Sequence, residues 1–180
     1  MILPITQYGN PVLRVRCKRV KEVTDEIRTL AESMIETMID ANGVGLAAPQ
    51  VAIELRIAVV DVSHDPECIS YLRVNGEDTD LAEIMPLVFI NPDLEAHGEK
   101  ELREEGCLSI EDITANVKRA TEVKGTFELL DGRVLEIETD GLLARAIQHE
   151  VDHLNGILFV DRLSAAAKLS VRGKLKRLGQ

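Results

Sequence analysis

The fold is decided by residues 140–154, which read DGLLARAIQHEVDHL. Apolar side chains recur in this stretch at the three- and four-residue spacing of an α-helix. They are Leu142, Leu143, Ala146, Ile147, Val151 and Leu154. Asp140-Gly141 precedes the pattern, and Gly156 ends it. We therefore expect an amphipathic helix that buries its apolar face at the centre of the molecule.

The same helix carries two histidines at the spacing of one turn. His149 and His153 are four residues apart, so their imidazoles project from one face and can bind one metal ion. Glu150 follows the first histidine and can reach a metal-bound water as a general base. Two metal-free surface histidines would predict a freely polar face, but this face also carries Leu142 and Ala146. We therefore favour a metal site.

A third ligand is expected upstream of the helix. After His153 the chain contains no His, Glu or Cys, and only Asp161 is a plausible donor. Upstream, residues 105–109 read EGCLS, in which Cys107 follows a glycine. Its thiolate would complete a Cys-His-His tripod with one position open for water. The alternative donors are His64, His97, Cys17 and Cys68.

A third segment of interest covers residues 43–50 and reads GVGLAAPQ. Its glycines and alanines predict close backbone packing. One interpretation is a loop that ends one helix and enters a strand. The other is a binding segment, in which Gln50 donates a hydrogen bond inside a pocket.

The remaining patterns predict an α+β fold, with small antiparallel sheets packed around the central metal-binding helix and a C-terminal helix. We expect a single domain over residues 1–180. In the first half of the chain, the patterns predict a helix over 25–41 capped by Thr24, a buried strand over 56–62 and an irregular surface excursion over 63–86. A strand over 87–90 is expected to end at Asn91-Pro92. A hairpin over 121–138 should turn at Asp131-Gly132, and a last helix should begin at Ser164.

Composition excludes several functional classes. The formal net charge of −10 argues against DNA and membrane-surface binding, and aromatic residues make up only 3% of the chain. No segment is apolar over the roughly 20 residues that a membrane span needs, and the N-terminus does not resemble a signal peptide. Three cysteines without a C-x-x-C pair favour a reducing compartment, so we expect a cytoplasmic protein.

Taken together, the three segments resemble the motifs of the peptide deformylase family. They are GVGLAAPQ at 43–50, EGCLS at 105–109 and HEVDH at 149–153, in the order that the family has them. The resemblance implies a metal-dependent hydrolase that removes the N-formyl group from the N-terminal methionine of newly made proteins and releases formate. It extends from Asn10-Pro11 to the start of the last helix.

The resemblance also implies roles for individual residues. Glu150 would be the acid and base, while Gln50 and the backbone N–H of Leu108 would polarise the formyl oxygen. The metal ligands would be Cys107, His149 and His153, and the cleft would be lined by Val44 and Gly45. We expect Leu142 and Ala146 to line a methionine pocket, or else to pack in the core.

Further expectations concern the metal and its surroundings. The family favours Fe²⁺, while a Cys-His-His site also accepts Zn²⁺, Ni²⁺ or Co²⁺. Glu105 and Arg119 could pair and brace the Cys107 segment, or be unrelated surface charges. Residues 111–114 read EDIT and depart from the pattern of many relatives, at a place that would flank the cleft.

The last helix is basic, with Lys168, Arg172, Lys174, Lys176 and Arg177 and no acidic residue. It could contact ribosomal RNA, or it could be a solvated helix face. The expected partners are therefore N-formyl-methionyl nascent peptides and, through this helix, the ribosome. Two other functional classes stay open, a metallopeptidase that uses the same helix and a non-catalytic metal-binding homologue.

Overall fold

The computed structural model describes residues 1–179 and has the expected α+β architecture. Four α-helices and seven strands are present among these residues. The helices are α1 (Asp25–Asp40), α2 (Leu81–Ile84), α3 (Gly141–Leu154) and α4 (Ala165–Leu178). The strands are β1 (Gly45–Ala47), β2 (Ile57–Val60), β3 (Leu72–Val74), β4 (Glu77–Asp78), β5 (Leu87–Cys107), β6 (Ile110–Glu128) and β7 (Val134–Asp140).

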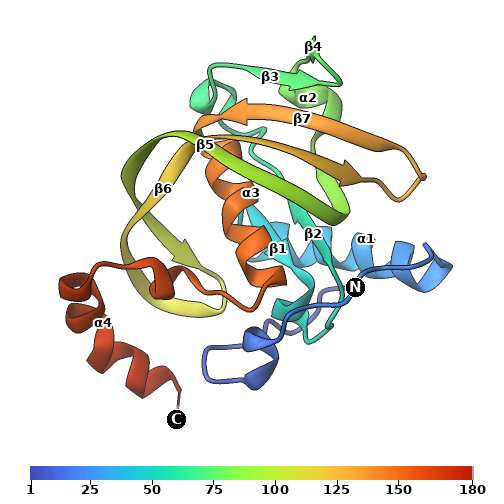
Figure 1. The fold of residues 1–180 in the computed structure, drawn as a ribbon. Helices are drawn as coiled ribbons and strands as arrows, with labels where there is room; N and C mark the ends of the chain where they lie inside the picture. Colours follow the sequence, from blue (N-terminus) through green and yellow to red (C-terminus); the bar gives the residue numbers. More distant parts are fainter. Residues whose placement is uncertain (180) are drawn as a thin grey trace.

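The strands form one antiparallel sheet rather than the several small sheets expected. Its order is β1-β2-β5-β6-β7-β3-β4. The sheet curves because β5 and β6 are long and their pairing shifts register at several points. As Figure 1 shows, these strands wrap around α3, which lies at the centre of the molecule.

Helix α1 and helix α3 cover opposite faces of the β1–β2 part of the sheet. Leu46, Ile57 and Val59 pack with Met34 and Met38 of α1. The alternating residues point the other way and pack with α3, among them Ala47, Ala58 and Val60. The side chains of a strand alternate between its two faces, so the apolar residues of β1 and β2 pack against α1 on one face and against α3 on the other. The small alanines let α3 approach the sheet closely.

The predicted helices are confirmed, together with their caps. Thr24 accepts a hydrogen bond from the backbone N–H of Ile27 at 3.3 Å, and Ser164 accepts one from Ala167 at 3.2 Å. No described helix combines the length and apolar character needed to cross a lipid bilayer.

The predicted end of a strand at Asn91-Pro92 is wrong. The strand continues as β5 to Cys107, and the register shifts between Ile90 and Asp93. Asn91 adopts a positive φ of 48°, and its side chain exchanges hydrogen bonds with Val20 at 2.8 and 2.9 Å. Pro92 has no N–H to donate to the sheet, but proline is tolerated at a bulge of this kind. Asn91-Pro92 therefore interrupts the regular strand pairing without ending the strand.

The excursion over residues 63–86 is more regular than expected. It contains β3, β4 and α2, and β3 pairs with β7. The hairpin predicted over 121–138 is present between β6 and β7 but is longer at both ends. Its turn has a three-residue loop, because Leu129 donates to the carbonyl of Arg133 at 2.8 Å, and Gly132 takes a φ of 90°.

Candidate metal centre and cleft

Helix α3 presents both histidines toward the inside of the curved sheet. Leu143, Ala144 and Ile147 are fully buried and fix the rotation of the helix about its axis. The Nε2 atoms of His149 and His153 consequently lie 3.2 Å apart. His149 Nδ1 lies 2.9 Å from Glu105 Oε1, so its Nε2 is the nitrogen that faces His153.

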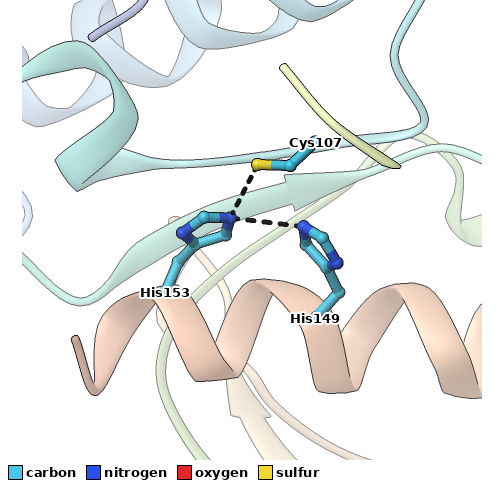
Figure 2. A group of neighbouring side chains, drawn as sticks. All are labelled: Cys107, His149 and His153. Carbon is cyan, nitrogen blue, oxygen red and sulfur yellow. Dashed lines mark hydrogen bonds between the residues drawn. The ribbon is translucent and has the colours of Figure 1, made fainter. Parts of the chain in front are cut away.

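Cys107 lies where β5 ends and the chain turns toward β6. Its Sγ is 3.4 Å from His153 Nε2. Figure 2 shows the sulfur above the two imidazoles, which rise from α3 one turn apart. The three ligand atoms lie within 4.8 Å of one another. Among the described residues, the alternative donors His64, His97, Cys17 and Cys68 are outside this group.

The arrangement fits a bound metal ion. Glu105 accepts a hydrogen bond from His149 Nδ1, so Nε2 is the His149 atom that faces His153. Burial lowers the pKa of His153 well below its usual range, whereas the charge of Glu150 and the contacts with Cys107 and Glu105 outweigh burial at His149 and raise its pKa. Two imidazole nitrogens and a sulfur that converge in this way can share one bound cation. A Cys-His-His set is one that Zn²⁺ and related ions accept.

Glu105 is the anchor for the first histidine. Its carboxylate accepts hydrogen bonds from Arg119 at 2.6 and 3.0 Å and from Arg145 at 2.6 Å, in addition to His149. Burial would raise the pKa of Glu105, but the hydrogen bonds from His149 and Arg119 and the charge of Arg119 lower it to about 2. The predicted pairing of Glu105 with Arg119 is therefore present, and both side chains are buried.

Two further members of this network were missed from the sequence. Asp152 accepts from Arg119 at 2.8 Å and from Arg162 at 2.5 and 2.7 Å. Arg145 donates to Glu105 and also to the backbone carbonyls of Glu101 and Val117. The available signal for Arg145 was its position four residues before His149 on a helix face that is otherwise buried.

Residues 43–50 form the opposite wall of the site. Gly45 lies in β1, and a Cβ added to it would overlap Glu150 Oε2. The carboxylate of Glu150 therefore rests directly on the backbone of Gly45, which explains the need for glycine here. A Cβ on Gly43 would in turn meet the side chain of Leu108 at 2.8 Å.

Gln50 lies beside Cys107 and is itself buried. Its Oε1 accepts a hydrogen bond from the backbone N–H of Ala47 at 2.9 Å, which orients the amide. Its Nε2 then points toward the site, donating to Ser109 Oγ at 3.1 Å and contacting Cys107 Sγ at 3.5 Å. The amide is thus a hydrogen-bond donor held next to the metal ligands.

Glu150 is almost fully buried, and its Oε1 has no hydrogen-bond partner among the described residues. Burial raises the pKa of this carboxyl to about 7. A carboxyl group with such a pKa exchanges protons readily near neutral pH.

These residues surround a cleft of ≈ 400 Å³. It brings together nearly all the side chains singled out from the sequence. Those that line it include Val44, Gly45, Gln50, Cys107, Leu108, Leu142, Ala146, His149 and Glu150. The cleft is also lined, as expected, by part of the 111–114 segment that departs from the pattern of many relatives, namely Asp112, Ile113 and Thr114. His153 lies behind them, 3.2 Å from His149.

Comparison with protein families gives a match over most of the chain. The model of the polypeptide deformylase family matches residues 2–169. A peptide deformylase of Methylacidiphilum infernorum is 42% identical over 179 residues, covering 99% of this chain and 93% of that protein. One from Acinetobacter baumannii is 44% identical over 178 residues, with coverage of 98% and 92%.

Solved structures are similar over the same length. The peptide deformylase of Synechococcus elongatus, in complex with actinonin, superposes with a TM-score of 0.81 at 38% identity and covers 98% of this chain and 86% of that one. A plant peptide deformylase gives a TM-score of 0.83 at 32% identity, with coverage of 98% and 88%.

Proposed function

The chain belongs to the peptide deformylase family and is a metal-dependent hydrolase with peptide deformylase activity, and from this premise we propose how its residues carry out the reaction. The substrates are formylated nascent peptides and water, and the products are formate and the peptide with a free amine on its N-terminal methionine. The observation that supports the proposal best is the convergence of Cys107, His149 and His153 beside a buried Glu150, whose Oε1 has no hydrogen-bond partner among residues 1–179. We take residues 1–180 as one catalytic domain.

Cys107, His149 and His153 would hold the metal ion. Family resemblance favours Fe²⁺, and Zn²⁺, Ni²⁺ and Co²⁺ suit the same donors. When bound, the ion acts as a Lewis acid that lowers the pKa of water and polarises the formyl group. Glu105 keeps His149 in the tautomer that offers Nε2, because its Oε1 lies 2.9 Å from Nδ1.

Glu150 is the acid and base. Its free Oε1 takes a proton from the attacking water and then delivers it to the departing amine. Because burial raises its pKa to about 7, the group can do both near neutral pH. Gly45 leaves room for the carboxylate, because a Cβ at this position would overlap Glu150 Oε2.

Gln50 and the backbone N–H of Leu108 stabilise the charge that develops on the formyl oxygen. Ala47 and Ser109 hold the Gln50 amide on either side, so no reorientation is needed during the reaction. Removal of one preorganised donor of this kind in other enzymes costs about 3–4 kcal/mol of transition-state stabilisation.

The methionine of the substrate occupies the apolar part of the cleft. Leu142 and Ala146 of α3 form one wall, and Val44 and Gly45 of the 43–50 segment form the other. An unbranched apolar side chain suits this lining.

Formate release from formyl-Met-Ala-Ser tests the function, with metal analysis of the same anaerobic sample. The wild type should release formate and leave internal peptide bonds intact. Cleavage of internal bonds would instead indicate a metallopeptidase, and bound metal without any turnover would indicate a non-catalytic homologue.

Glu150→Ala should keep its metal and lose turnover. Cys107→Ser should lose metal affinity, and unchanged metal content would contradict the tripod.

Two finer proposals concern where the enzyme works. We place it in the cytoplasm, because nascent formylated chains and a thiolate ligand both suit a reducing compartment. The basic helix α4 is the surface that would approach ribosomal RNA. Its last turn carries Lys176 and Arg177, and the rest of the chain is strongly acidic. Binding of the enzyme to ribosomes that weakens steeply with added salt would support this contact.

A further inference from the structure

Residues 5–8 connect the two segments that supply the proposed hydrogen-bond donors to the formyl oxygen, and we call these residues the strap. The backbone N–H of Thr6 donates to the carbonyl of Gln50 at 2.7 Å. Two residues later, the N–H of Tyr8 donates to the carbonyl of Ser109 at 2.8 Å. The strap therefore joins parts of the site that lie far apart in the sequence.

Gln7 adds a side-chain donor at the middle of the strap. Its Nε2 donates to the carbonyl of Leu108 at 3.1 Å and to the carbonyl of Ile5 at 3.3 Å. The bond to Ile5 ties the amide to the strap itself. The bond to Leu108 reaches the residue whose backbone N–H is the second proposed donor to the formyl oxygen.

We propose that the strap holds the two donors at the separation that the formyl oxygen needs, and that Gln7 is a positioning residue that acts through Leu108. This inference rests on the proposed function, because it takes the Gln50 amide and the Leu108 N–H as the groups that contact this oxygen. Gln7 itself is not among the described residues that line the cleft, so its effect on the reaction is indirect.

The strap and the two segments form a closed ring of hydrogen bonds. Gln50 Nε2 donates to Ser109 Oγ at 3.1 Å, which joins the two segments directly. The amide nitrogen has a second hydrogen that stays free for the substrate. A single side-chain contact would let one segment turn against the other, but Thr6 and Tyr8 join the same two segments a second time. Their relative position is therefore fixed.

The strap is held on both sides. Before it, the N–H of Leu3 donates to Thr37 Oγ1 of α1 at 2.9 Å. After it, Asn10 accepts a hydrogen bond from the N–H of Val12 at 3.1 Å and caps a short 3₁₀-helix over Pro11–Arg14. A segment fixed at both ends can hold the groups that it contacts in place.

The experiment removes the Gln7 amide and keeps its length. Gln7→Met leaves the Leu108 carbonyl without this donor. For formate release from formyl-Met-Ala-Ser, kcat per bound metal ion should fall about tenfold, which is less than the roughly 100-fold effect of a displacement on the order of 1 Å. KM should stay within about twofold, because donors to a developing charge act in the transition state. Gln7→Asn, whose amide is one methylene shorter, should lose kcat in the same way.

A conservative variant should restore the lost rate. In Gln7→His, Nε2 lies as many bonds from Cβ as the amide nitrogen does, so it can donate to Leu108 and should recover most of kcat. Thr79→Val is the matched control, because it also removes a side-chain hydrogen bond to a main-chain carbonyl, from Thr79 to Glu77 at 3.0 Å. Thr79 does not line the cleft, so this variant should keep the wild-type kcat and KM.

Urea unfolding of the metal-free proteins separates positioning from a purely structural role. A Gln7→Met variant that is less stable but keeps the wild-type kcat per bound metal ion overturns the proposal. An equal loss of kcat in Gln7→His and Gln7→Met also overturns it, because the donor would then not matter. If the wild type and Thr79→Val release no formate at all, the proposed function itself fails, which is a separate outcome.

Discussion

At the scale of single residues, the closest constraint in the site is the contact between Gly45 and Glu150. No side chain fits at Gly45 without moving the Glu150 carboxylate. Gly45→Ala should therefore lower kcat about 100-fold, because a displacement on the order of 1 Å has that effect on a positioned catalytic group. The measurement is steady-state formate release with metal content determined in parallel.

The control for this substitution is Gly173→Ala, where an added Cβ meets nothing within 4 Å. Gly173 lies inside α4, so alanine should leave kcat unchanged and raise the free energy of unfolding by roughly 0.5–1 kcal/mol. Normal turnover in Gly45→Ala would mean that the Glu150 carboxylate does not have to rest where the structure has it.

The residues that bear the chemistry were predictable when their signal was local. His149 and His153 follow from helical spacing alone. The chain after His153 has few donors, which placed the third ligand upstream, and the family motif at 105–109 singled out Cys107 among the upstream candidates. Arg145 and Asp152 were missed because their partners lie on β5, on β6 and in the segment that follows α3. A charged residue on a buried helix face indicates that it has a hydrogen-bonding or oppositely charged partner, but the sequence does not identify that partner.

At the scale of elements, Arg119 joins β6 to both β5 and α3. Its side chain is 2% exposed and pairs with Glu105 and Asp152, whose side chains are also buried. Arg119→Ala leaves buried carboxylates without their shared cation, so the free energy of unfolding should fall by about 3–5 kcal/mol. Urea unfolding of the metal-free proteins measures the change.

The matched control is Arg28→Ala, which breaks the exposed pair of Arg28 with Asp25 on α1. Exposed pairs contribute little, so this variant should unfold close to the wild type. If the two variants have the same free energy of unfolding, the buried network around Arg119 does not stabilise the packing of β5, β6 and α3.

Helices were easier to predict than strands in this chain. α1 and α3 show apolar periodicity, and α1 and α4 have hydrogen-bonding caps, so their limits were nearly correct. Strand β5 lacks the alternation of a half-buried strand, because it is exposed along most of residues 93–104, whereas β6 alternates over residues 123–127. Its pairing depends on bulges and on contacts with β6, which neither segment shows alone.

At the scale of the whole molecule, three hydrophobic clusters meet around one curved sheet. The metal centre lies where the central helix α3 meets the turn between β5 and β6. Two of its ligands come from the helix and one from the end of β5. A bound ion therefore cross-links the core helix to the ribbon that wraps around it, in addition to taking part in the reaction.

Removal of the metal should consequently lower the stability of the entire fold. A ligand present at about 100 times its Kd stabilises the native state by about 2.7 kcal/mol. For a protein of this size that corresponds to a Tm difference of about 5–11 °C between the loaded and the chelated protein. Scanning calorimetry in the presence and absence of a chelator measures the shift. His153→Ala should abolish it, whereas His97→Ala should keep it, because His97 lies outside the cluster and is half-exposed. A shift that survives in His153→Ala would place the stabilising ion elsewhere in the molecule.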